Sequence, residues 1–154
     1  MYRIVSLRDF SRVKKGDKGG LVQSEDNLSH EGDCWIYSNA IVTENSRVEH
    51  NAKIFKYAKI SGNAVIYGDA IIEGHAAVFG NVEIYGDVNI SGEARVTGNA
   101  LILGNTVICD NTLVSGNVRV CGDSRITGDT SVSGNTVITG ASHTNNDIVC
   151  NVII

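Results

Sequence analysis

The sequence predicts an all-β fold, a single-stranded parallel β-helix with an N-terminal cap, and three observations support the parallel coil. Ile or Val returns at every sixth residue from Ile36 to Ile138, eighteen times without interruption. A small side chain, such as Ala40 or Ala58, stands two residues before most of these positions, and Gly-Asn or Gly-Asp pairs recur between them. A six-residue period fits a short strand followed by a corner, and three such sides close one turn of a prism.

Residues eighteen apart match better than residues six apart, so eighteen residues make one coil. One inner column is all isoleucine: Ile36, Ile54, Ile72, Ile90, Ile108 and Ile126. The next holds Val42, Ile60, Val78, Val96, Val114 and Val132, and one corner column is all asparagine: Asn45, Asn63, Asn81, Asn99, Asn117 and Asn135. With coils about 4.8 Å apart, six coils make a rod about 30 Å long. Ile, Val and Ala side chains fill its interior and leave no room there for a ligand.

The corners are expected to need backbone with positive φ, which Gly, Asn and Asp tolerate best. Stacked Asn side chains are also expected to form a hydrogen-bonded ladder along the axis. Fourteen of the eighteen corner places from Asn39 to Ala141 hold Asn or Asp. Tyr57, His75 and Glu93 depart from this rule on one column in consecutive coils. If these three residues had positive φ, each would cost on the order of 1 kcal/mol, which would indicate a function there.

Two parts of the chain are expected, a capping segment over residues 1–21 and a solenoid of about seven coils over residues 22–154. Residues 2–7 (YRIVSL) predict a short strand, and a charged, glycine-containing connection follows. Ser24 and His30 occupy inner places, so the first coil is expected to be irregular, with His30 as part of the cap. Trp35 and Tyr37 are expected to point outward beneath the cap, which protects the end of the solenoid.

The C-terminal end is apolar after a break in the register. Ser142 and Thr144 replace a core pair, and Ile148 and Cys150 then restore the pattern. The apolar residues 152–154 are expected to close the last coil or to join a neighbouring subunit.

Composition disfavours several classes of function. A net charge of −4 with 19% charged residues gives no basic excess for nucleic-acid binding. Neither an apolar signal-peptide core at the N-terminus nor an apolar run long enough to span a membrane is present, so a cytoplasmic protein without membrane contact is expected. Cysteine is found at four positions without metal-type spacing, which predicts free thiols: Cys34, Cys109, Cys121 and Cys150.

The repeats resemble those of left-handed β-helix hexapeptide-repeat proteins, and the likeness covers essentially the whole chain. The leading motif LRDF…KKGDKGGLVQSEDNLSHEGDCWIYSNA is similar to the N-terminus of bacterial and prophage members, often described as transferases or polymer-forming proteins. The resemblance implies the left-handed coil, which departs from the usual right-handed crossover. It also implies a homotrimer and a bacterial or prophage origin. The repeat is specific for the fold but not for one function.

One outward face carries an apolar strip along several coils. Its residues are Val65, Tyr67, Tyr85, Leu101, Leu103, Cys121 and Val137. A strip of this length predicts an interface between subunits, a trimer by the resemblance. The alternative is that these side chains only satisfy strand propensity.

The unusual corner column predicts a ligand site. Tyr57, His75 and Glu93 are expected within reach of one another, with basic residues around them: Lys56, Lys59 and Arg95. Stacking and charge at such a cluster suit a small anionic ligand, such as a nucleotide-like metabolite or signal, held between subunits. The alternative is a tolerant corner surrounded by ordinary surface charges.

Three functions remain open, and no cofactor is expected for the first two. The favoured hypothesis is a non-catalytic homo-oligomer that captures such a ligand, and the second is a scaffold or polymer-forming subunit. The third is an acyltransferase using acyl-CoA, with His75 as general base and Glu93 orienting it. Against the third, the repeat runs without an inserted loop from Cys34 to Ala141, and such a loop would be needed to shape a pocket. Zinc catalysis is disfavoured because the histidines do not fall on neighbouring coils of one column: His30, His50, His75 and His143.

Overall fold

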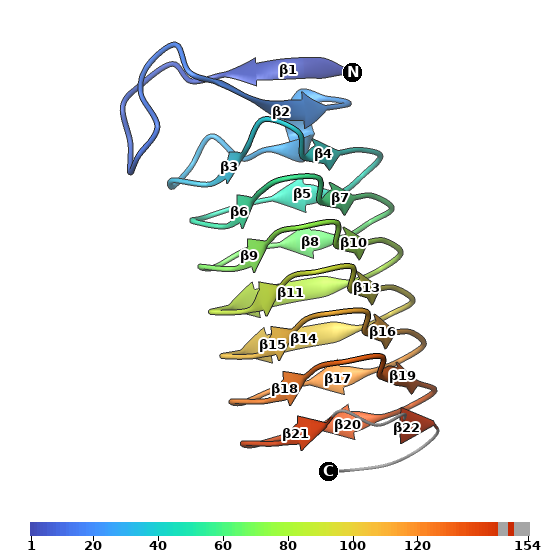
Figure 1. Cartoon of the computed structure of the whole chain (residues 1–154). Coiled ribbons are helices and arrows are strands. Elements are labelled where there is room, and N and C mark those ends of the chain that lie inside the picture. The colour runs from blue at the N-terminus through green and yellow to red at the C-terminus, as the bar shows by residue number, and fades with distance from the viewer. Residues whose placement is uncertain (145–147, 150–154) are drawn as a thin grey trace.

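The computed structural model describes residues 1–144 and 148–149, which form a rod of stacked coils (Figure 1). Three sheets run along the rod, and the described residues contain one short helix, the 3₁₀ turn η1 (Glu25–Asn27). From β3 to β21 the parallel strand partners are eighteen residues apart, as in Ile36 with Ile54 and Val78 with Val96. The all-β solenoid and its eighteen-residue coil are therefore confirmed.

Each side of the prism is one sheet, and the strands between corners are mostly two residues long. Sheet A contains, in order, β1 (Tyr2–Val5), β2 (Lys18–Val22), β4 (Ile41–Val42), β7 (Lys59–Ile60), β10 (Ala77–Val78), β13 (Arg95–Val96), β16 (Leu113–Val114), β19 (Ser131–Ser133) and β22 (Ile148–Val149). Sheet B contains β3 (Trp35–Ile36), β6 (Lys53–Ile54), β9 (Ile71–Ile72), β12 (Asn89–Ile90), β15 (Val107–Ile108), β18 (Arg125–Ile126) and β21 (His143–Thr144). Sheet C contains β5 (Arg47–Val48), β8 (Val65–Ile66), β11 (Glu83–Gly86), β14 (Leu101–Gly104), β17 (Arg119–Val120) and β20 (Val137–Ile138).

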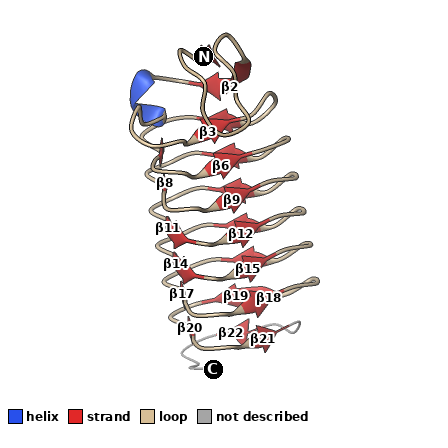
Figure 2. Cartoon of the chain, turned by 90° about the vertical axis from the view of Figure 1, so that its left-hand side faces the viewer, coloured by secondary structure: helices blue, strands red, loops and turns tan. Residues whose placement is uncertain are grey.

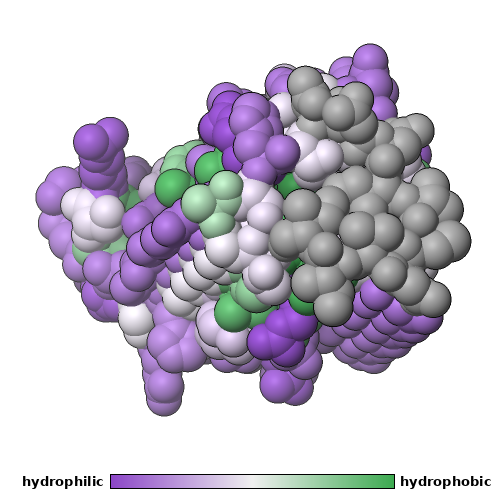
Figure 3. Space-filling model, turned by 90° about the horizontal axis from the view of Figure 1, so that it is seen from below, coloured by the Kyte–Doolittle hydropathy of each residue, from purple (hydrophilic) through white to green (hydrophobic). Residues whose placement is uncertain are grey.

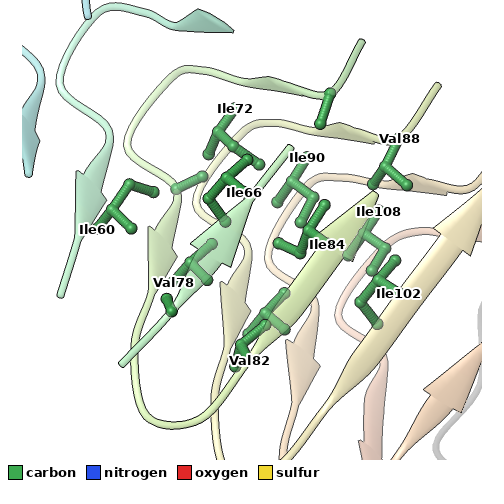
Figure 4. Close-up of a cluster of buried hydrophobic side chains, with 14 of the residues drawn as sticks. Ile60, Ile66, Ile72, Val78, Val82, Ile84, Val88, Ile90, Ile102 and Ile108 are labelled. Carbon is green, nitrogen blue, oxygen red and sulfur yellow. The ribbon is translucent and has the colours of Figure 1, made fainter. Parts of the chain in front are cut away.

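The core lies along the axis and is built from the predicted columns. Ile54, Ile72 and Ile90 of sheet B are completely buried, as are Val78 of sheet A and Ile84 of sheet C. Figure 4 shows Ile72, Ile90, Val78 and Ile84, with neighbouring isoleucines and valines of the three sheets, converging on the interior. Each fully buried Ile or Val contributes roughly 1.5–3 kcal/mol relative to exposure. The periodic burial of these side chains explains why the six-residue pattern determines the fold.

The N-terminal segment covers the first end of the solenoid. β1 pairs antiparallel with β2, which itself pairs in parallel with β4, so the predicted boundary between residues 21 and 22 falls within β2. Trp35 is only 5% exposed and meets Phe10 edge to face, with ring centroids 5.6 Å apart. The expectation that Trp35 lies beneath this segment is thus confirmed, while Tyr37 stacks on Phe55 of the next coil at 4.1 Å.

A fully buried asparagine organises the irregular first coil. The side-chain oxygen of Asn27 accepts hydrogen bonds from the N–H groups of Gln23 and Ser24, both at 2.9 Å. Its amide nitrogen donates to the carbonyl oxygens of Glu44 and Ser46, at 3.0 and 2.8 Å. A buried polar side chain with its bonds satisfied fixes a local geometry that the repeat itself does not provide.

The corners confirm the asparagine ladder and correct the predicted backbone. Along the column each amide nitrogen donates to the next side-chain oxygen, as from Asn63 to Asn81 at 2.8 Å and from Asn81 to Asn99 at 3.0 Å. Positive φ, however, falls one residue earlier, mostly on glycines such as Gly74 and Gly92. The predicted strain at the Asn position, and therefore at the three exceptional corner residues, is wrong, because the residue before each of them makes the left-handed turn: Gly74 before His75, Gly92 before Glu93 and Lys56 before Tyr57.

Seen at right angles, the corners project as regular loops on both sides of the strands (Figure 2). Viewed from below, rows of hydrophilic residues run along the rod, with smaller hydrophobic areas between them (Figure 3). Among the described residues, no helix is long and apolar enough to cross a bilayer. The apolar C-terminal residues 150 and 152–154 lie outside the described part of the chain.

Candidate functional site

The unusual corner column lies where the chain passes from sheet B to sheet A. Tyr57 follows β6 and His75 follows β9, so their side chains stand on neighbouring coils. Their rings stack with centroids 5.0 Å apart and planes 5° from parallel. Tyr57 is 53% exposed, so this pair presents an aromatic edge to solvent. The sequence-predicted proximity of Tyr57 and His75 is therefore found in the structure.

Lys56, next to this pair, forms an ion pair with a neighbouring carboxylate. Its φ is 56°, so a lysine takes the left-handed place that glycine holds in the next two coils of the column. Its Nζ atom lies 2.8 Å from the Oε2 atom of Glu73, the residue that follows β9. Because Glu73 offsets its charge, Lys56 contributes little net attraction for an anion.

Lys59 and Arg95 are better placed to meet an anion together. Lys59 lies on β7 and Arg95 on β13. Ala77 of β10 lies between them and pairs with both. Strands about 4.8 Å apart put their Cα atoms about 10 Å apart, with only a methyl group between them. Both cations are exposed, and neither has an ion-pair partner in the described part of the chain. Lys59 and Arg95 thus form a small cationic surface on sheet A, beside the stacked rings.

Glu93 does not join His75 in a catalytic pair. Within residues 1–144 and 148–149, no ion pair or side-chain hydrogen bond connects the two residues. The backbone N–H of Glu93 instead donates to the carbonyl oxygen of Asp110, in the coil ladder. A general base needs an orienting partner at hydrogen-bond distance, and the column does not provide one for His75.

The predicted interface residues all lie on the outer face of sheet C and are half-buried: Val65, Tyr67, Tyr85, Leu101, Leu103 and Val137. Tyr67 and Tyr85 stack with ring centroids 5.1 Å apart. Tyr85 is also directly paired with Leu103, because β11 and β14 are longer than the neighbouring strands. Burial raises the pKa of the Tyr67 hydroxyl above its ordinary value, and the carboxylate of Glu83 adds to this. Tyr67, Tyr85 and Leu103 form an unbroken apolar row over the middle coils. The neighbouring row of Val65, Leu101 and Val137 is interrupted by the exposed side chains of Glu83 and Arg119, which pair between them. We call the six apolar residues together the sheet C strip.

Metal-binding clusters and reactive cysteines are the two other kinds of site that we considered. No cluster of three or more His, Cys, Asp or Glu side chains suitable for a metal ion occurs in the described parts of the chain. Cys109 has a raised pKa, mainly through burial and then through the nearby Asp110 carboxylate. Cys34, Cys109 and Cys121 are all free thiols, as the sequence predicted for them.

Sequence reasoning missed a cavity between the N-terminal segment and the first coil. Its volume is about 380 Å³, and residues of both parts of the chain line it. The sequence offered one signal for this contact: the aromatic residue Phe10 in the non-repeating segment and the aromatic residue Trp35 at the start of the repeats. They indicated a packed contact, but the space beside that contact depends on the path of the connecting loop, which no period determines.

Comparisons with known proteins support the repeat architecture. The model of the YdcK beta solenoid repeat family matches residues 58–76, about one coil. No curated protein matches the chain. The matched segment runs from Ala58, before β7, to Ala76, before β10, and so includes strands of all three sheets. The chain is thus a parallel β-solenoid protein, one of whose coils is similar to the YdcK solenoid repeat.

Proposed function

We propose that the protein is a non-catalytic, homo-oligomeric scaffold whose subunits associate laterally through the sheet C strip. The observation that carries the proposal is the run of half-buried apolar side chains across β8, β11 and β14, including the Tyr67–Tyr85 stack. A contiguous apolar surface on a regular, polar rod is typical of an association site. The segment that covers Trp35 protects one end of the solenoid, which favours lateral over end-to-end contact.

A closed trimer is the assembly that we expect. Each rod has three faces, one of which carries the strip, and the resembled hexapeptide-repeat proteins commonly assemble as trimers. Free thiols at Cys34, Cys109 and Cys121 support a cytoplasmic location for this assembly, because reducing compartments preserve them. The similarity of the N-terminal motif to prophage proteins supports a bacterial or phage origin.

Sedimentation at several concentrations and native mass spectrometry test the assembly. We expect a trimer mass that stays constant with concentration, and a monomer after the double substitution Tyr85→Lys and Leu103→Lys. Leu113→Lys, on the outer face of β16 in sheet A, is the matched control because Leu113 is 39% exposed. A monomeric wild type, a mass that grows without limit, or equal dissociation of the control would contradict the proposal.

A second candidate function is capture of a small anion at the corner column. The observation that favours it is the row formed by Lys59, Ala77 and Arg95 beside the Tyr57–His75 stack. An aromatic face next to exposed cations suits a nucleotide-like molecule. Native mass spectrometry of protein from a bacterial lysate would detect a stoichiometric small adduct. Its loss in Tyr57→Ala, His75→Ala and Arg95→Ala, but not in Arg125→Ala on sheet B, would support this function, and an adduct retained in all variants would exclude the site.

The acyl-CoA alternative has less support from the geometry. His75 lies against Tyr57 rather than against a carboxylate, and its column is an exposed corner of a bare prism. An adduct with the mass of CoA in the same experiment would revive it.

A further inference from the structure

The cavity beside the N-terminal segment has walls from two parts of the chain. Ile4, Leu7 and Phe10 come from the capping segment, while Leu28 and Trp35 come from the first coil. Its volume of about 380 Å³ lies within the range of small-molecule sites. Ile4 and Leu28 pack against the core, so this wall is anchored to the solenoid.

The lining is mainly apolar, and its polar groups are satisfied locally. The Cys34 thiol lies on the wall and donates to the carbonyl oxygen of Ser29 at 3.3 Å. The hydroxyl of Ser6, which is 3% exposed, donates to the carbonyl oxygen of Arg8 at 2.6 Å. Buried polar groups that already have partners do not require a polar ligand.

The charged groups at the rim are paired with one another. Arg8 donates to the carbonyl oxygen of Gly32 at 2.6 Å and to an Asp33 oxygen at 3.2 Å, and its guanidinium lies 4.8 Å from the Phe10 ring centre. The Nε2 atom of His30 lies 3.1 Å from an oxygen of Glu25. The two basic side chains that line the cavity, Arg8 and His30, therefore each have a carboxylate within 3.2 Å. A charged ligand would lose hydration at this apolar site without gaining an unpaired counter-charge.

We propose that this cavity binds an uncharged, mainly apolar small molecule of roughly two-ring size. The proposal is independent of the sheet C strip and of the corner column, which lie on later coils. Aromatic and aliphatic side chains supply the contact area, and the paired rim excludes charged compounds. Binding would also join the capping segment to the first coil, because both contribute walls.

Two dyes with one skeleton test the class of ligand. N-phenyl-1-naphthylamine is neutral, and 1-anilinonaphthalene-8-sulfonate adds a sulfonate to the same rings. Trp35 is the chain's single tryptophan and lines the cavity, so energy transfer from its emission to a bound dye reports occupancy near it. We expect one neutral dye per chain, binding at least about tenfold tighter than the sulfonate, because the sulfonate would lose hydration there without meeting an unpaired cation.

Leu7→Asp is the test variant and Leu113→Asp its matched control. Leu7 lines the cavity but is 79% exposed, so the fold should tolerate the change, which circular dichroism verifies. We expect Leu7→Asp to weaken the neutral dye about tenfold and Leu113→Asp to leave it unchanged. Saturating neutral dye should also slow alkylation of Cys34 at a pH near 11, where this thiol ionises. No energy transfer up to the solubility limit, equal affinity for both dyes, or equal loss in both variants would overturn the proposal.

Discussion

The distance to the next coil limits which residues can occupy the left-handed positions at the corners. A Cβ atom built on Gly80 (φ 94°) would lie 2.8 Å from the carbonyl oxygen of Gly98. At two places where an acidic residue replaces the glycine, its side chain bonds to the next coil: the Asp110 carboxylate accepts a hydrogen bond from the Gly128 N–H at 2.9 Å. Glu44 makes the same contact with the Gly62 N–H at 2.6 Å. Glycine is therefore the default at these corners, and an acidic residue can replace it by binding the coil that follows.

Substituting Gly80 and Gly16 separates strain from collision. Both have φ of 94°, but no atom lies within 4 Å of a Cβ built on Gly16. Gly16→Ala should lower the free energy of unfolding by about 1–2 kcal/mol through backbone strain alone. Gly80→Ala should cost roughly 1–3 kcal/mol more, because the methyl group presses on the next coil. Urea denaturation followed by circular dichroism measures both values, and equal losses would show that coil spacing does not limit residue choice.

The Cys34 thiol should be unreactive at neutral pH. Burial raises its pKa from 9.0 to about 11, with smaller opposing effects from its hydrogen bonds. The folded protein therefore holds the proton between pH 9 and 11 while the unfolded chain releases it, so this group's contribution to stability is present below pH 9 and is lost as pH rises to 11. Alkylation of Cys34, followed by peptide mass mapping, should accelerate only as the pH approaches 11, with urea-unfolded protein as the reference. Rapid labelling of the folded protein at pH 8 would contradict this assignment.

Among the structural elements, the corner between sheets A and C is held by the asparagine ladder. Asn81 accepts from Asn63 and donates to Asn99, whereas Asn45, at the start of the ladder, donates to Asn63 only. Each bond links adjacent coils outside the sheets. The ladder therefore reinforces the same stacking that the β-strand pairing produces.

Truncation of two ladder residues measures this reinforcement. Asn81→Ala removes two side-chain bonds and should lower the free energy of unfolding by about 1–2 kcal/mol, while Asn45→Ala removes one and should cost about half as much. Thermal or urea unfolding provides the comparison. Equal, negligible effects of the two changes would mean that water replaces the ladder at no cost.

At the scale of the whole molecule, each coil contacts only its neighbours, so a local change should act locally. Phe10→Ala removes the edge-to-face contact with Trp35 and the ring beneath Arg8. Trp35 emission should shift to the red, and the midpoint of the unfolding transition measured by this emission should fall. The midpoint measured by far-ultraviolet circular dichroism, which averages over all coils, should fall less. Identical shifts by both probes would indicate that the rod unfolds as one unit.

The sequence predicted the solenoid well because burial itself is periodic. Each inner Ile or Val must be buried at the same point of its repeat. The sequence period therefore predicts the strands, their eighteen-residue register and the asparagine ladder. The non-repeating parts did not follow: Asn27 fixes the first coil through four bonds, and no pattern indicated its burial. The site prediction brought Tyr57 and His75 together correctly, but it placed the strain one residue late and did not anticipate the Lys56–Glu73 ion pair.

The fixed pairing of residues eighteen apart also constrains how the gene can change length. Duplicating or deleting one complete coil adds or removes a layer and leaves every later side chain on its own face, as the pairing of Ile84 with both Ile66 and Ile102 requires. Losing a single six-residue repeat would preserve the inward and outward alternation but rotate everything downstream by one third of a turn. If the lost repeat lay between Val65 and Tyr85, Tyr85 and Leu103 would leave the face that carries Val65. Natural variants of this rod should therefore differ in length by whole coils, and a surface patch can be lengthened or shortened without being redesigned.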